Sequence, residues 1–71
     1  PSTVPDAATL LRFALVKRGA EVEALRETAR AFLAAAQNSD GGWGPYRNAP
    51  SEPFDTALAV LALAEDRDAP Q

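Results

Sequence analysis

The stretch that decides the fold runs from residue 32 to residue 44 and reads Phe32-Leu33-Ala34-Ala35-Ala36-Gln37-Asn38-Ser39-Asp40-Gly41-Gly42-Trp43-Gly44. Its first part is aromatic and aliphatic, as at the end of a helix, and Gln37 follows directly. Gly41 and Gly42 permit a positive φ and a close backbone approach, so the chain can reverse sharply here. The reversal directs Trp43, the only tryptophan, back toward the helix and within reach of Gln37.

The rest of the chain predicts three helices and no strand, at about 4–18, 20–37 and 53–65, with one long loop at 38–52. Thr3 can cap the first helix, and Gly19 is a natural stop for it. The first and third helices are apolar on nearly every face, which is typical of helices with neighbours on several sides. We expect the tail from Asp66 onward to fray.

The middle helix is amphipathic. Its apolar stripe, at spacings of three and four, consists of Val22, Leu25, Ala29, Phe32, Leu33 and Ala36. The opposite face carries two i,i+3 ion pairs, Glu23–Arg26 and Glu27–Arg30, each worth about 0.2–0.5 kcal/mol. The pattern predicts an outer helix with one wet side.

Four residues carry a resemblance to a known family: Phe32, Gln37, Gly41 and Trp43. Their order resembles the QW motif of the squalene cyclase and protein prenyltransferase superfamily, which closes one repeat of an α/α toroid. The resemblance implies an all-α fold of helical hairpins, with about one and a half repeats in residues 1–71, as a single helical-repeat domain or a fragment. It also implies a structural role, in which the indole packs over the Gln37 amide and Gln37 binds backbone groups of a neighbouring repeat.

Glu52 and Asp55 form the only plausible catalytic pair. Class II terpene cyclases carry an Asp-x-Asp-Asp motif that leads into Thr-Ala and an inner helix, and the middle aspartate donates a proton. Alignment on Asp55-Thr56-Ala57 places Phe54 at that position, and Phe54 has no proton to give. We therefore expect no catalytic residue here, and expect Asp55 to interact with the helix N-terminus at an exposed site, worth about 0.3–1 kcal/mol.

The composition excludes several classes of site. The 71 residues contain no cysteine and no histidine, which removes disulfides, Cys/His zinc sites and Ser-His-Asp catalysis. We expect no metal and no cofactor. The net charge of −3 is mixed along the chain, so we expect no nucleic-acid partner. The apolar run 57–64 is too short to span a bilayer, and no N-terminal signal is visible, which favours a cytoplasmic location or one peripheral to the membrane through a parent protein.

Three functions stay open. The first is a structural repeat module of a terpene-cyclase-like or prenyltransferase-like protein, non-catalytic by itself. The second is a fragment of a class II terpene cyclase of the squalene-hopene type, an isomerase or lyase whose catalytic motif lies outside these residues. The third is a free-standing, protein-binding helical module. The length of the native open reading frame distinguishes them, since a 71-residue gene supports the module.

The expected binding partners follow from the number of apolar and amphipathic helices. Two helices that are apolar all round cannot be enclosed by one amphipathic helix, so part of the apolar surface must face outward. We expect a homo-oligomer, or contact with the remaining repeats of a parent chain. In a complete toroid, the resemblance also allows a hydrophobic isoprenoid ligand.

Overall fold

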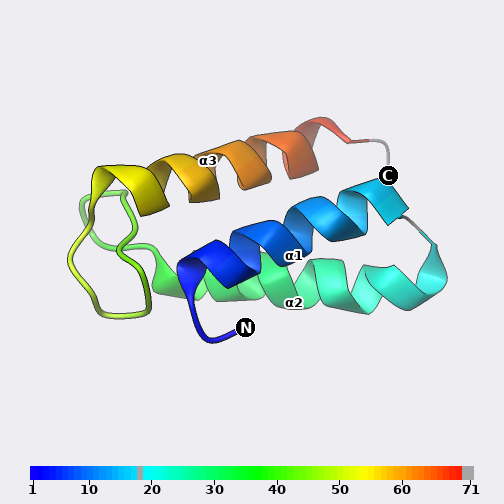
Figure 1. Ribbon diagram of the computed structural model, residues 1–71, viewed down its shortest axis with the longest axis horizontal. Helices are drawn as coiled ribbons and strands as arrows, with labels where there is room; N and C mark the ends of the chain where they lie inside the picture. The colour runs from blue at the N-terminus through cyan, green and yellow to red at the C-terminus, as the bar shows by residue number, and fades with distance from the viewer. Residues whose placement is uncertain (18, 70–71) are drawn as a thin grey trace.

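The computed structural model describes residues 1–17 and 19–69 and contains three helices in that part of the chain, with no strand (Figure 1). Helix α1 is Val4–Lys17, α2 is Ala20–Ala36 and α3 is Pro53–Asp68. The all-α prediction is confirmed. Helix α1 lies between the other two and packs against both, while the long loop joins α2 to α3 at one end of the bundle.

Local chemistry accounts for where each helix begins. The Thr3 hydroxyl accepts a hydrogen bond from Asp6 N at 3.2 Å, and Val4 N donates to Pro45 O at 2.8 Å, so the start of α1 is tied to the loop. Helix α2 begins after Gly19, whose φ of 108° favours glycine. Helix α3 begins with Pro53 in its first turn.

Two expected helix ends differ from the structure. Gln37 is extended and lies outside α2, which ends at Ala36. The expected end of the third helix at 65 and the frayed tail from Asp66 were wrong, because α3 continues to Asp68 and buries Asp66. Arg18, the expected end of the first helix, and residues 70–71 of the tail lie outside the described residues.

The core is built mostly from small side chains. Its members are Val4, Ala7, Ala8, Leu11, Ala29, Leu33, Ala36, Trp43, Ala59 and Ala62. Alanine at six of these ten positions lets the helices approach closely, but it supplies little apolar surface per residue. The few large buried groups, Leu11, Leu33 and Trp43, therefore carry a disproportionate share of the hydrophobic stabilisation.

Helix α2 faces the core along most of the expected stripe and departs from it at one turn. Leu25 was expected to face inward, but it is 39% exposed, whereas Arg26, assigned to the wet side, is buried. The buried residues of α2 are Arg26, Ala29, Leu33 and Ala36, at spacings of three and four. The prediction was wrong at this turn because it assumed that a charged residue such as Arg26 faces solvent and that an apolar residue such as Leu25 faces the core.

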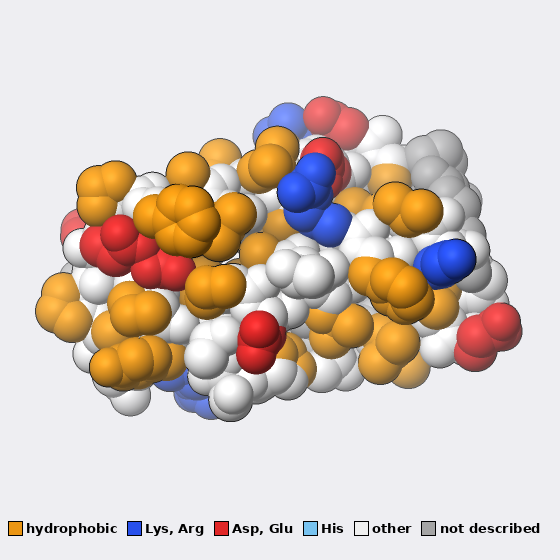
Figure 2. Space-filling view, in the orientation of Figure 1, with side chains coloured by type: hydrophobic (Ala, Val, Ile, Leu, Met, Phe, Trp, Pro, Cys, Tyr) orange, Lys and Arg blue, Asp and Glu red, His pale blue; other side chains and the backbone are white. Residues whose placement is uncertain are grey.

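Large apolar side chains are exposed on the other two helices. Phe13 and Val16 of α1 are 47% and 79% exposed, and Phe54, Val60 and Leu61 of α3 are also exposed. Figure 2 shows hydrophobic side chains gathered over both helices on one broad side of the molecule. Within the described residues, no helix has the length and hydropathy needed to cross a membrane.

Candidate functional site

The turn that follows α2 is closed by backbone hydrogen bonds. Asn38 N donates to Gly42 O at 2.8 Å, and Gly41 N donates to Asn38 O at 2.9 Å. Gly41 has a φ of 89°, and a Cβ there would meet no atom within 4 Å. Gly41 is thus required for backbone conformation and not for space.

The next two glycines are required for space. A Cβ on Gly42 would lie 2.7 Å from Ser51 Oγ, and one on Gly44 would lie 2.7 Å from Ala49 O and closer still to Pro50 O. Backbone carbonyls cannot move aside as a flexible side chain can. The outgoing and returning halves of the loop therefore touch at Gly44 because no side chain is present.

Trp43 connects the end of α2 to the beginning of α3. Its side chain is buried, at 3% exposure, and its Nε1 donates to Leu33 O at 2.8 Å. The Leu33 carbonyl belongs to the last turn of α2, where carbonyls have no partner within the helix. The Trp43 backbone N donates to Thr56 Oγ1 at 2.9 Å, and Glu52 N donates to Trp43 O at 2.9 Å.

Gln37 and Phe32 lie close to this connection in different roles. Gln37 Nε2 donates to Gly41 O at 2.9 Å, so its amide is used within its own turn. Gln37 and Trp43 line one hollow of about 360 Å³ together with Arg30 and Leu63. Phe32 is half-buried and packs against the core.

A polar network holds the inside of the loop. Asn38 Nδ2 donates to Ala49 O at 2.8 Å and to Ser51 Oγ at 2.9 Å. Asp40 Oδ1 accepts from Ser51 Oγ at 2.7 Å and from Gly42 N at 2.9 Å, and these two hydrogen bonds lower the pKa of Asp40. In the described part of the chain, no group of three or more Asp or Glu side chains is placed to hold a metal ion.

Glu52 and Asp55 are brought together at the start of α3, but not as expected. The Glu52 carboxylate is the N-cap and accepts from Phe54 N at 3.1 Å and from Asp55 N. Asp55, expected at an exposed site, is only 5% exposed, so that expectation was wrong. A hydrogen bond with Glu52, burial and the Glu52 charge raise the pKa of Asp55 to about 6, while the same hydrogen bond lowers the pKa of Glu52.

Chemically, these two carboxyl groups can share one proton. Phe54, between them in sequence, is 66% exposed and makes no polar side-chain contact. The pair is built to cap a helix, with Glu52 supplying the acceptor that the first turn needs.

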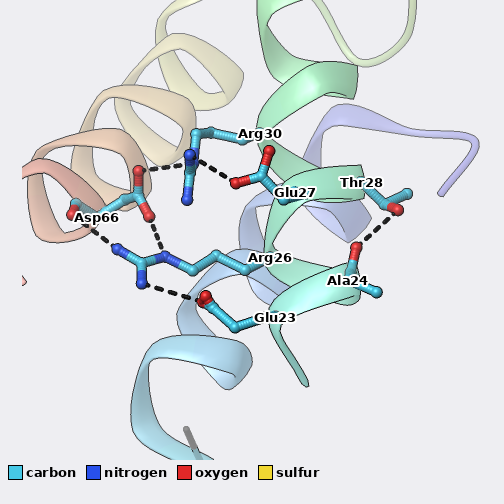
Figure 3. Close-up of polar contacts among 7 residues, drawn as sticks. All are labelled: Glu23, Ala24, Arg26, Glu27, Thr28, Arg30 and Asp66. Carbon is cyan, nitrogen blue, oxygen red and sulfur yellow. Dashed lines mark hydrogen bonds and ion pairs between the residues drawn. The ribbon is translucent and has the colours of Figure 1, made fainter. Parts of the chain in front are cut away.

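At the far end of the bundle, Asp66 of α3 lies between two arginines of α2 (Figure 3). Arg26 Nε donates to Asp66 Oδ1 at 2.6 Å, and Arg26 Nη2 donates to the Asp66 carbonyl at 3.3 Å. The hydrogen bond to Asp66 raises the pKa of Arg26. Both side chains are about nine-tenths buried, so this ion pair joins α2 to α3 in a largely water-free setting.

The second arginine completes the cluster. Arg30 Nε lies 3.0 Å from Asp66 Oδ2, an ion pair without hydrogen-bond geometry, and Arg30 Nη1 lies 2.9 Å from Glu27 Oε1. Glu23 contacts Arg26 at 3.3 Å. Sequence analysis found both i,i+3 pairs and missed Asp66. The available signal was the position of Arg26, seven residues before buried Leu33 and so on the same face of α2.

The comparisons with known proteins give two relatives with the same name. The chain is 60% identical over 38 residues to drimenyl diphosphate synthase of Streptomyces showdoensis, covering 54% of this chain and 7% of the relative. It is 46% identical over 41 residues to drimenyl diphosphate synthase of Streptantibioticus cattleyicolor, covering 58% of this chain and 8% of the relative. Part of this chain is homologous to part of drimenyl diphosphate synthase. The chain spans less than a tenth of the length of either relative. No family model matches, and no solved structure matches.

Proposed function

We propose that this chain is a structural helical-repeat segment of a protein of the class II terpene cyclase type. The observation that carries the proposal is the 60% identity over 38 residues to drimenyl diphosphate synthase. It favours the terpene cyclase branch of the superfamily over the prenyltransferase branch. The activity of the relatives belongs to chains more than ten times as long as the matched segment.

The geometry of the turn supports a structural role. Trp43 uses its indole N–H, its backbone N–H and its carbonyl to join α2 to α3, and Gln37 closes the turn that carries it. These groups are occupied by contacts within the protein. A residue used in this way sets the angle between successive helices, which is the property that a repeat must reproduce to form a toroid.

The carboxyl pair supports a non-catalytic assignment for this segment. Glu52 is engaged in capping α3, and Asp55 is buried against it. The side chain at the position of the resembling motif's proton donor is Phe54, which cannot donate a proton.

A second candidate is a segment of a working cyclase whose acidic motif lies elsewhere in a longer protein. The name of both relatives, a diphosphate synthase, favours it. In that protein, the segment would help to enclose an isoprenoid diphosphate without touching its reacting atoms. The two candidates differ only in whether the parent protein has an intact acid motif.

The test is a chimera. The matched segment of the Streptomyces showdoensis enzyme is replaced by the corresponding residues of this chain, and formation of drimenyl diphosphate is measured. We expect the chimera to keep its product, and to lose it together with its folded state on Trp43→Ala. Tyr46→Ala, a change at a 56% exposed loop residue, is the matched control and should leave the product unchanged.

The isolated chain provides the complementary test. Incubated with farnesyl diphosphate, geranylgeranyl diphosphate or squalene, it should give no cyclic product. Turnover that disappears on Glu52→Gln or Asp55→Asn would contradict the non-catalytic assignment. A folded chimera that makes no drimenyl diphosphate would contradict the structural equivalence.

A further inference from the structure

The turn after α2 contains the pair Asp40-Gly41, whose peptide linkage can rearrange without an enzyme. The backbone nitrogen of Gly41 can attack the side-chain carboxyl carbon of Asp40, because these two atoms close a five-membered ring. Glycine has no side chain to obstruct the approach. Both residues are exposed, so water can reach them. The pair is therefore a candidate site of covalent modification.

The rearrangement has two steps and needs no reagent other than water. First, a bond forms between Gly41 N and Asp40 Cγ, and the proton of the nitrogen and the hydroxyl of the carboxyl group leave as water. Water then adds to one carbonyl carbon of the cyclic imide. Cleavage of the Cγ–N bond restores aspartate. Cleavage of the bond between the Asp40 main-chain carbonyl carbon and the nitrogen gives isoaspartate, in which the main chain runs through Cγ.

The folded loop opposes the first step in two ways. Gly41 N donates a hydrogen bond to Asn38 O at 2.9 Å, and the imide nitrogen carries no proton, so ring closure must break this bond. The reactive form of Asp40 is the neutral acid, because a carboxylate has no hydroxyl to lose. Hydrogen bonds from Ser51 Oγ, at 2.7 Å, and from Gly42 N, at 2.9 Å, lower the pKa of Asp40 and so favour the unreactive charged form.

Ser51 connects this turn to the rest of the fold. Its hydroxyl donates to Asp40 Oδ1 and accepts from Asn38 Nδ2 at 2.9 Å. Ser51 belongs to the returning half of the loop and lies 11 residues after Asp40. A short peptide with the sequence of the turn lacks it. Protection of the pair thus depends on the closed connection between α2 and α3.

We propose that Asp40-Gly41 is a site of spontaneous isoaspartate formation, which the folded loop holds closed through Ser51. Isomerisation inserts one carbon into the main chain just before Trp43 and moves the free carboxylate away from its contacts with Ser51 and Gly42. A transient opening of the loop is then made permanent by a covalent change. The inference goes beyond the proposed repeat function and rests on the loop alone.

The first test compares the 71-residue chain with a peptide of residues 36–45, capped at both ends, during incubation at pH 6. Isoaspartate has the mass of aspartate, so proteolytic fragments are separated by chromatography and identified by electron-transfer fragmentation at Asp40. We expect isomerisation in the chain to be at least about tenfold slower than in the peptide, because the loop must open first. Circular dichroism establishes that the chain holds its helices.

The variant Ser51→Ala tests the mechanism of protection. It leaves the Asp40-Gly41 pair unchanged and removes two hydrogen bonds, so isomerisation in the folded chain should accelerate about 5- to 30-fold. The matched control is Ala24→Gly, at an exposed position of α2 far from the loop in sequence. Glycine within a helix costs about as much stability as one lost hydrogen bond, so this variant weakens the fold without touching the turn. Its rate should stay close to that of the parent.

Hydrogen exchange of the parent chain gives a decision even if Ser51→Ala unfolds. The Gly41 amide nitrogen is the attacking group, and its exchange reports the opening that frees it. The slowing of isomerisation relative to the peptide should equal the protection of this amide to within a factor of about three.

Three results would overturn the proposal. The first is a chain that isomerises as fast as the peptide, whether folded or not. The second is a folded Ser51→Ala variant that is no faster than Ala24→Gly. The third is a slowing of isomerisation unrelated to the protection of the Gly41 amide. None of these results bears on the chimera, so failure of this inference is distinguishable from failure of the proposed function.

Discussion

The two ends of this bundle are held together by different kinds of interaction. At one end, Trp43 joins α2 to α3 through backbone groups and through partners at most 13 residues away, Leu33 and Thr56. At the other end, Arg26 and Asp66 meet across 40 residues through charged side chains. Local contacts of the first kind leave a pattern in the sequence. Contacts of the second kind arise only once the helices have packed, which is why they are absent from any short motif.

The difference also predicts how each end fails. A buried tryptophan contributes area and shape, so its loss creates a cavity. A buried ion pair contributes little net energy when intact, but removal of one member leaves a charge without a partner. The following experiments separate these two kinds of stabilisation, in order of expected effect.

Trp43→Ala should have the largest effect. Truncation of a buried tryptophan costs about 3–5 kcal/mol, against a total stability of about 5 kcal/mol for a domain of this size. We expect loss of the cooperative thermal transition followed by circular dichroism. Tyr46→Ala should melt within a few degrees of the parent. A Trp43→Ala protein that melts near the parent temperature would show that the turn does not hold the bundle.

Asp66→Ala should come next, at about 3 kcal/mol, because it strands the buried Arg26 guanidinium. The matched control is Asp68→Ala, which breaks the exposed Arg67–Asp68 pair and should cost at most about 0.5 kcal/mol. The measurement is the midpoint of urea unfolding. The double variant Arg26→Met/Asp66→Leu should recover most of the loss, since well-packed apolar groups can replace a buried ion pair. Equal midpoints for Asp66→Ala and Asp68→Ala would show that burial of the cluster has no energetic consequence.

Gly44→Ala should cost about 1–3 kcal/mol, the range for forcing an extra carbon into a packed site. Its Cβ would meet the carbonyls of Ala49 and Pro50, which belong to the loop backbone. Gly41→Ala meets no neighbour and is strained only by its φ of 89°, so it should cost about 1 kcal/mol. Thermal melts of the two variants give the order directly. A larger loss for Gly41→Ala would mean that backbone conformation, and not close approach, limits the loop.

The smallest effect concerns pH. Asp55 has a pKa of about 6 in the folded protein against 3.8 as an ordinary aspartate, so the folded state binds its proton more tightly. The stability that this proton confers is fully present below pH 3.8 and is lost as the pH rises through 6. The chain has no histidine to titrate in the same window. Urea unfolding should therefore show a higher midpoint at pH 5 than at pH 7.

Asp55→Asn is the matched control for this pH dependence. It cannot ionise, so its midpoint should change less between pH 5 and pH 7 than that of the parent. Glu52, with its lowered pKa, acts in the opposite sense and only as the pH falls below 4.5. A parent chain that is more stable at pH 7 than at pH 5 would contradict the assignment of a shared proton to this pair.

Several features could be predicted from the sequence. Periodicity and Gly19 located the beginnings of the three helices, and the spacing of Gly41 and Trp43 located the turn. Burial of Asp55 could not be predicted, because an acidic residue in a first helical turn is ordinarily exposed to solvent. The start of α3 is held against the loop by the hydrogen bonds of Trp43 with Thr56 and Glu52, and such packing is encoded by no pattern local to Asp55.

The sequence by itself determined the all-α fold, the order of the helices and the residues of the turn, because helix periods and glycine positions act over a few residues. Only the tertiary structure decided which residue of the second turn of α2 faces inward: Arg26 is buried and Leu25 is exposed. It also extended α3 to Asp68, because the ion pairs of Asp66 with Arg26 and Arg30 hold a segment whose own sequence would fray. Both differences have the same cause. Arg26 and Asp66 can be buried because each is the charged partner of the other, and they lie 40 residues apart in the sequence.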